Sequence, residues 1–266
     1  MALTQSTNKS FLINENKSVT FWAGGGSDIE KIKYTVRDIQ SESWGPQGVA
    51  INAEGLRPSG FGGFDQSDFL FRKISDDKIF IAVRGGGGGV NTVIYTFGTI
   101  LGNTIDFSAH KILQRLGEDA EPTHLSVSAL VINDDSDPFI LFSFTEGSSF
   151  RIVRIIENED DSDIGDFGSI YPYYTRLIRK NNLVLASGLT PYQSSVTFTG
   201  CRPFVKAFNL SIATKNISPI TGGYKEWAVP LLTGPGKCSA LDIFFTGEGY
   251  NFMILGPENS ASVVPA

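Results

Sequence analysis

Short runs that alternate apolar and polar residues recur along the chain, and most of them come in pairs. Alternation with a period of two is typical of half-buried β-strands. In each pair the first run ends near Gly or Asn, and the second is rich in aromatic residues. The five first runs are residues 17–23, 78–83, 125–132, 183–187 and 240–245, and their partners are residues 32–36, 92–97, 139–144, 195–198 and 251–255.

These pairs predict five β-hairpins and therefore an all-β protein. Phased on presumed turns at Gly24, Gly85, Asn133, Gly188 and Gly247, the hairpins form an irregular five-fold repeat of the β-propeller type. Further strands over residues 150–156 and 204–210 would give several units three or four strands. A β-sandwich or jelly roll also uses many short alternating strands, and it is the alternative fold. No linker-like stretch divides the chain, so we expect a single β-rich domain over residues 1–266.

Two segments fit a helix as well as a strand. Ser27 and Glu30 have the spacing of a helix capping box, and apolar residues follow at helical spacing as far as Ile39. Residues 109–116 likewise place their apolar members on one helical face, which stops at Gly117. Both alternatives stay open at this point.

Composition narrows the classes of partner. Hydrophobic residues make up 41% of the 266 residues and charged residues 19%, which is typical of a folded protein. The 22 basic and 28 acidic residues give a net charge of −6, and the basic ones are scattered, so we expect no nucleic-acid partner. No apolar run has the length of a membrane span or signal peptide, so we expect no membrane insertion. The location predicted on this basis is cytoplasmic, virion-associated or released by a non-classical route.

Motifs for metal, cofactor or nucleophilic chemistry are missing from the sequence. The glycine run 85–89 is not followed by GK[ST] and is interpreted as a hairpin loop instead of a phosphate-binding loop. His110 and His124 are the only histidines, with no HExxH or GxSxG motif. Cys201 and Cys238 fit two buried thiols. The acidic stretch 157–166 fits a solvated loop better than a calcium site. We therefore predict no metal and no cofactor.

A pair of carboxylates is the one type of catalytic site that the sequence does not exclude. Glycoside hydrolysis needs only two of them, which the fold can bring together from distant positions. Asp65, Asp68, Asp134 and Asp242 fall at candidate turn positions, and Asp242 interrupts an apolar run. An outward-facing strand position is the simpler explanation for Asp242.

Aromatic residues near predicted loops supply the candidate binding site. Aromatic faces pack against the CH-rich faces of sugars, and neighbouring polar groups satisfy the hydroxyls. The predicted ligand-binding residues are Trp44, Tyr171, Tyr173, Tyr174 and Arg176.

Three functions follow from these residues. The leading one is a non-enzymatic, lectin-like recognition module that binds carbohydrate or a cell-surface partner through loop aromatics, so that enzymatic activity is not favoured. The second is a structural or receptor-binding component of a virus or phage particle, with possible assembly into a homo-oligomer or particle. The third is a propeller glycoside hydrolase that uses two Asp carboxylates.

Overall fold

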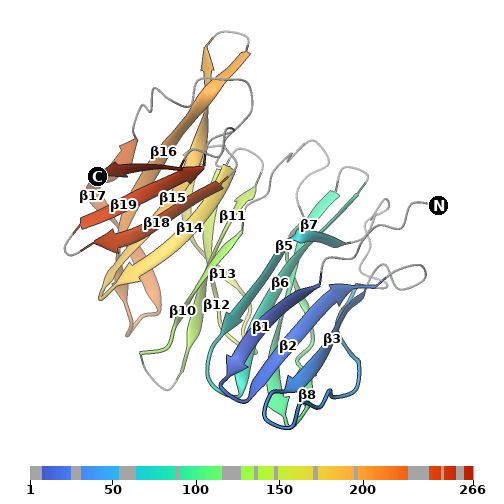
Figure 1. The fold of residues 1–266 in the computed structure, drawn as a ribbon. Helices are drawn as coiled ribbons and strands as arrows, with labels where there is room; N and C mark the ends of the chain where they lie inside the picture. The colour runs from blue at the N-terminus through green and yellow to red at the C-terminus, as the bar shows by residue number, and fades with distance from the viewer. Residues whose placement is uncertain are drawn as a thin grey trace. The chain divides into compact units, whose positions relative to one another are not determined.

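Strands account for all the regular structure that is described (Figure 1). The computed structural model describes residues 8–24, 31–53, 64–87, 90–115, 127–134, 137–146, 149–169, 173–194, 197–226, 240–246, 249–255 and 261–265. In these ranges there is no helix long and apolar enough to cross a membrane.

The described strands form five antiparallel sheets, which we call A to E in chain order. Sheet A comprises β1 (Lys9–Asn14), β2 (Lys17–Ala23), β3 (Lys31–Asp38) and β4 (Gly48–Asn52). Sheet B comprises β5 (Phe64–Lys73), β6 (Lys78–Gly87), β7 (Val90–Leu101) and β8 (Thr104–Phe107), and β9 (Lys111–Arg115) also pairs with β7. Sheet C comprises β10 (Ser128–Ile132), β11 (Phe139–Glu146), β12 (Ser149–Ile155) and β13 (Ser162–Ser169). Sheet D comprises β14 (Tyr173–Lys180), β15 (Leu183–Ser194), β16 (Thr197–Ser211) and β17 (Asn216–Glu226). Sheet E comprises β18 (Ala240–Thr246), β19 (Gly249–Leu255) and β20 (Ala261–Pro265).

This architecture confirms the all-β, propeller-like prediction. Within each sheet the strands lie side by side in chain order, as a meander. A jelly roll would instead place strands that are distant in the chain next to each other. The described strands therefore favour repeated hairpins over the jelly-roll alternative.

Four of the five predicted hairpins are present with their predicted partners, as the pairs β2–β3, β6–β7, β10–β11 and β18–β19. Residues 183–187 also belong to a hairpin, β15–β16, but they pair with residues 205–209 and not with the predicted partner 195–198. The repeat looked irregular because these pairs are not equivalent. In sheets A, B and D the hairpin joins the second and third strands, whereas in sheets C and E it joins the first and second. Two presumed turns are wrong: Gly85 and Gly188 lie inside β6 and β15, paired with Thr92 and Phe204.

Neither helical alternative survives where the chain is described. In β3 the buried residues are Ile32, Tyr34 and Val36, which alternate with half-buried polar ones, so the period is two. The capping-box residues lie outside the described ranges. In the second segment, residues 111–115 form β9, which pairs with β7. Pairing with a neighbouring strand satisfies the backbone here, and this long-range contact is invisible to local periodicity.

The chain divides into two compact units, unit 1 over residues 1–122 and unit 2 over residues 123–266. Sheets A and B form unit 1, and sheets C, D and E form unit 2. The prediction of one domain over the whole length stays a prediction.

The core of unit 1 combines aliphatic side chains from sheets A and B with a cluster of aromatic rings. The rings of Phe11 and Phe71 are stacked with centroids 4.5 Å apart, and Phe69 lies 5.0 Å from Phe21. Tyr34 completes this cluster and reaches from sheet A to sheet B. Its hydroxyl donates to the Ile105 carbonyl oxygen at 2.7 Å and accepts from the Ile105 amide at 3.0 Å.

Aliphatic residues and phenylalanines fill the core between sheets C and D in unit 2. Its members come from β10, β11 and β12 on one side and from β14, β15, β16 and β17 on the other. The largest fully buried side chains in this cluster are Phe139, Phe150 and Phe208.

Each meander has two rims at which its strands begin and end. We call the rim where the first strand of a sheet begins the start rim, and the opposite one, where that strand ends, the far rim. In sheet D the hairpin of β15 and β16 projects past its neighbours at the start rim (Figure 1). β14 pairs only as far as Leu189 and β17 only as far as Phe204, whereas β15 and β16 stay paired to Ser194 and Thr197. The projecting arm consists of residues 190–194 and 197–202.

Candidate functional site

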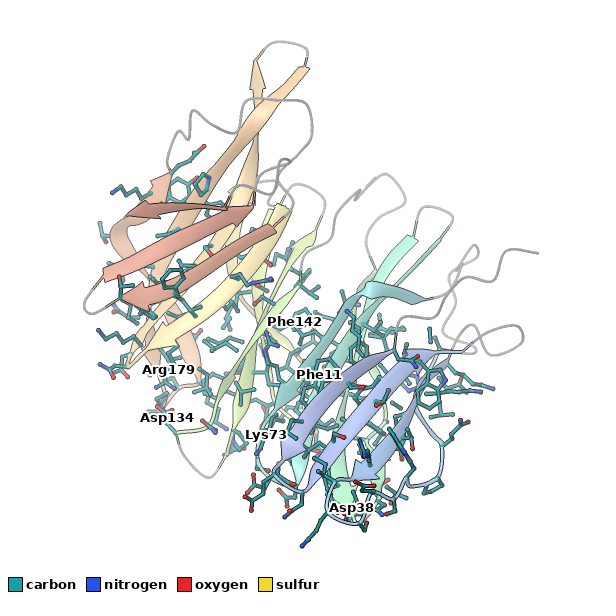
Figure 2. The ribbon with its side chains drawn as sticks, in the orientation of Figure 1. Phe11, Asp38, Lys73, Asp134, Phe142 and Arg179 are labelled. Carbon is teal, nitrogen blue, oxygen red and sulfur yellow. The ribbon has the colours of Figure 1, made fainter. Side chains whose placement is uncertain are left out.

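The far rim of unit 2 is held by ion pairs between sheets C and D. Arg179, near the end of β14, binds both carboxylate oxygens of Asp134, which follows β10 (Figure 2). Lys215, in the turn before β17, pairs with Asp137. The guanidinium of Arg179 lowers the pKa of the Asp134 carboxyl, chiefly through this hydrogen bond. Asp134 is therefore an ionised structural partner and does not fit the role of a proton-donating catalytic acid.

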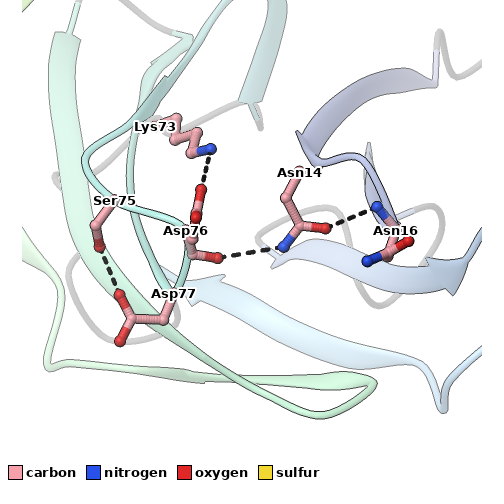
Figure 3. Close-up of polar contacts among 6 residues, drawn as sticks. All are labelled: Asn14, Asn16, Lys73, Ser75, Asp76 and Asp77. Carbon is pink, nitrogen blue, oxygen red and sulfur yellow. Dashed lines mark hydrogen bonds and ion pairs between the residues drawn. The ribbon is translucent and has the colours of Figure 1, made fainter.

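Carboxylates at the far rim of unit 1 are occupied in a similar way. Lys73 pairs with Asp76 at 2.5 Å, and the Ser75 hydroxyl donates to Asp77 at 2.5 Å. Both contacts are drawn in Figure 3. Asn14 connects this turn to the β1–β2 turn by donating to the Asp76 carbonyl oxygen at 3.5 Å. The Ser75 contact lowers the pKa of Asp77. The carboxylates of Asp76 and Asp77 therefore stabilise the turn between β5 and β6 and are not oriented as catalytic groups.

The start rim of unit 2 collects four of the residues that the sequence singled out. Tyr173 and Tyr174 are the first residues of β14, Arg176 follows on the same strand, and Asp242 is the third residue of β18. β14 lies beside β10 on one side and β18 on the other. The backbone therefore brings these residues to one rim, although the side chains of Tyr173, Tyr174 and Asp242 lie outside the description.

Arg176 lies on the face of sheet D that turns away from sheet C. Leu177 and Ala186 belong to the core shared with sheet C, so their strand neighbours Arg176 and Ser187 face the other way. Arg176 Nη1 donates to the Thr175 carbonyl oxygen at 3.1 Å. The Ser187 hydroxyl, directly opposite Arg176, is fully buried and has no hydrogen-bond partner in the described part of the chain. An unpaired buried hydroxyl is unusual and marks this spot as polar.

Three buried hydroxyls underlie the same rim on the face toward sheet C. The Leu177 amide donates to Ser128 Oγ at 3.1 Å, which joins β14 to β10. The Ser143 hydroxyl lies 3.4 Å from both the Ser128 carbonyl oxygen and Thr175 Oγ1. We call Ser128, Ser143 and Thr175 the hydroxyl cluster. It fixes the relative position of two first strands just below the candidate site.

Trp44 does not lie at a start rim, unlike Tyr173 and Tyr174. It follows the third strand of sheet A at the far rim of unit 1, where the guanidinium carbon of Arg37 lies 5.6 Å from the centre of its ring. Its side chain is 57% exposed. Tyr173, in contrast, opens the first strand of its own sheet. The predicted aromatic site therefore divides into a tyrosine segment at a start rim and a tryptophan at a far rim.

The remaining sequence candidates lie wholly or partly outside the description. Asp65 and Asp68 are in β5, but their side chains are not described, and Tyr171 and Cys238 fall outside the described ranges. Cys201 is in β16, again without a described side chain.

Three residues of interest were missed by the sequence analysis. They are Glu146 at the end of β11, Ser187, and Tyr224 in β17. Glu146 could have been noticed as an acidic residue that ends an apolar strand. The other two are identifiable only from burial and contacts in the fold.

Comparison with known proteins gives structural similarities alone. No family model and no curated protein matches the sequence. An exo-1,5-α-L-arabinanase from a bovine ruminal metagenomic library has a TM-score of 0.44 at 9% identity, over 99% of this chain and 95% of that one. An endo-arabinase from Bacteroides thetaiotaomicron has a TM-score of 0.45 at 9% identity, with the same coverage. The Cellvibrio cellulosa α-L-arabinanase, solved with arabinohexaose, has a TM-score of 0.40 at 8% identity, over 96% of this chain and 89% of that one.

These findings correct the leading functional prediction. The prediction of a non-enzymatic, lectin-like module is wrong on this comparison, because the three similar structures named above are those of arabinanases. They agree better with the third hypothesis, the propeller glycoside hydrolase. With TM-scores below 0.5 the likeness assigns no substrate and no residue role to this chain. The virus-particle and homo-oligomer hypotheses stay predictions.

Proposed function

We propose that this protein is a glycoside hydrolase whose reaction takes place at the start rim of unit 2. The observation that carries the proposal is the contrast between the two rims of that unit. The far-rim carboxylates Asp134 and Asp137 are held in ion pairs. At the start rim, Asp242 interrupts an apolar strand beside the segment that carries Tyr173 and Arg176.

Two carboxyl groups are required, one to protonate the leaving oxygen and one to act as base or nucleophile. We assign Asp242 as one of these two groups. We assign Glu146 as the other, because it ends β11 at the start rim of sheet C and β11 also contacts β14. Glu226 ends β17 at the same rim of sheet D, but it accepts a hydrogen bond from Tyr224 on the outermost strand. We therefore assign the reaction to Asp242 and Glu146.

Binding of the sugar is assigned to the β14 segment. Tyrosine rings at positions 173 and 174 would stack on pyranose or furanose faces, and the guanidinium of Arg176 would donate to ring hydroxyls. The hydroxyl cluster acts below this layer, where it holds the strand that carries these side chains.

Turnover of defined glycans tests the proposal. Arabinan and β-1,3-galactan are the first substrates to try, since arabinanases and an exo-β-1,3-galactanase are among the similar structures. We expect Asp242→Asn and Glu146→Gln each to lower kcat by about 100-fold or more, because each removes a proton-transfer or nucleophilic group. Asp134→Asn is the matched control at the far rim and should keep full activity. No release of sugar by the unaltered protein from any tested glycan, or an active Asp242→Asn variant, would overturn the assignment.

A further inference from the structure

Tyr224 is an exposed aromatic residue held in a fixed orientation on the outer strand of sheet D. Its side chain is 42% exposed, yet its ring is stacked on the fully buried ring of Phe204, with centroids 6.1 Å apart and planes inclined by 27°. Its hydroxyl donates to Glu226 Oε2 at 3.2 Å. One part of the ring is thus anchored in the protein while another part faces solvent.

A bulge in β17 sets this position. Lys206 pairs with Tyr224 and Phe208 pairs with Pro219, so four residues of β17 lie opposite Ala207 alone. Gly222, within the bulge, has a φ of 73°, which side-chain-bearing residues rarely adopt. Bulges reorient the side chains that follow them, and they are frequent next to functional sites. The strand geometry here serves to place Tyr224 and Glu226 at the rim.

The Tyr224 hydroxyl has a defined protonation state. Burial, followed by the charge of Glu226 and the hydrogen bond to it, raises the pKa of Tyr224 to about 12. At neutral pH the phenol is therefore a neutral hydrogen-bond donor next to a carboxylate acceptor. Because the one phenol hydrogen is donated to Glu226, the pair offers an apolar ring face beside fixed acceptor oxygens, which match the CH face and the hydroxyl donors of a sugar.

We infer that Tyr224 and Glu226 form a second carbohydrate contact, distal to the reacting site, that receives a sugar unit of a long glycan chain. This inference rests on the proposed function. β14 and β17 are the two outer strands of a four-stranded sheet, so they lie about 14 Å apart at a spacing of about 4.8 Å per strand. A monosaccharide glycoside held at Tyr173 cannot span that distance, whereas a polymer can. The protein therefore acts on polysaccharides in preference to short glycosides.

Substitutions at Tyr224, measured on polymer and on short substrates, test this contact. We expect Tyr224→Ala to weaken binding of polymeric arabinan or galactan about tenfold by calorimetry and to raise KM on the polymer, with kcat unchanged. Activity on a chromogenic monosaccharide glycoside should stay the same. Tyr224→Phe keeps the ring and should lose less than about threefold. Leu12→Ala, which removes an exposed apolar side chain from unit 1, is the control and should change nothing.

Two results would overturn the inference and can be told apart from failure of the proposed function. Equal polymer affinity of Tyr224→Ala and the unaltered protein removes the contact, even if Asp242→Asn is inactive. An equal loss on polymer and on the monosaccharide glycoside would show a general defect instead of a distal contact. If the protein binds polymer without cleaving it and Tyr224→Ala weakens that binding, the contact stands and the hydrolase assignment falls.

Discussion

The joint between sheets A and B in unit 1 and the joint between sheets C and D in unit 2 use different strands for their polar contact. In unit 1 the Tyr34 hydroxyl, from the third strand of sheet A, binds both backbone groups of Ile105 in the fourth strand of sheet B. In unit 2 the Ser128 hydroxyl, from the first strand of sheet C, binds the Leu177 amide in the first strand of sheet D. The unit 2 contact therefore fixes the strand that carries the candidate site, whereas the unit 1 contact joins a third strand to a fourth strand.

The largest effect is expected from removing the Tyr34 hydroxyl. Tyr34→Phe keeps the ring but leaves a buried amide and a buried carbonyl of Ile105 without their partner. Each such loss costs about 1 to 3 kcal/mol, so we expect the free energy of unfolding to fall by about 3 kcal/mol. Urea denaturation measures this change. An unchanged midpoint would show that the hydroxyl does not contribute to the joint.

Substitution of Gly48 is an independent way to disrupt the Tyr34 contact between sheets A and B. Gly48 lies opposite Tyr34, and a Cβ atom there would approach the Tyr34 ring to 2.3 Å. Gly48→Ala should therefore displace the ring and lower the free energy of unfolding by about 2 kcal/mol. In the Tyr34→Ala background the same substitution should cost much less, which a double-mutant cycle would show.

A smaller effect is expected from the hydroxyl cluster of unit 2. Ser128→Ala leaves the Leu177 amide unpaired, and we expect a loss of about 1 to 2 kcal/mol together with faster hydrogen exchange at that amide. Ser10→Ala is the control, because its hydroxyl contact with Thr20 is exposed. Protection of Leu177 that is unaffected by Ser128→Ala would contradict the role given to the cluster.

The alkaline titration of Tyr224 tests the contacts of β17, the outer strand of sheet D in unit 2. A phenol whose pKa is raised to about 12 in the folded state stabilises the fold below pH 10 and loses that contribution as the pH rises from 10 toward 12. Glu226→Gln removes the neighbouring charge, so the pKa should fall toward 10. Phenolate absorbance follows this titration, and an unchanged pKa would mean that burial alone sets it.

The smallest effect concerns the far rim of unit 2. The Asp134 pKa is lowered in the folded state, so its pairing with Arg179 stabilises the fold above the unfolded value near 3.8 and is lost as the pH falls through the lowered one. Asp134→Asn should lower the Tm at pH 7 by less than about 2 °C, since the pair is solvent-exposed. The difference from the unaltered protein should vanish at the lowest pH. A constant difference at all pH values would show that the ion pair is not its cause.

Local alternation was enough to predict four of the hairpins, because residues such as Val19, Phe21, Ile32 and Tyr34 alternate with polar ones over whole strands. It gave residues 183–187 the wrong partner, because the long strand β16 continues well beyond the predicted segment. It could not assign 111–115 to a strand, since β9 is defined by pairing with β7, from which β8 separates it in the chain. It also placed turns at glycines that the structure uses inside strands.

The candidate site was predictable only in part. Asp242 and the Tyr173 segment were visible as breaks in pattern, and the topology then brought them to one rim of unit 2. Asp134 looked equivalent to Asp242 in sequence, but its partner Arg179 is 45 residues away. Ser187 and Tyr224 have no sequence signature, because their burial and ring contacts depend on strands paired across the fold.

The arm formed by β15 and β16 offers a length that can be tuned separately from the rest of sheet D. Because side chains alternate with a period of two, deleting two residues from each of its strands would preserve which side chains share a face. Each such step would shorten the ribbon by about 7 Å, at about 3.4 Å per residue. A graded series of trimmed arms would thus vary how far this ribbon extends past the start rim of sheet D, with the rest of the sheet unchanged.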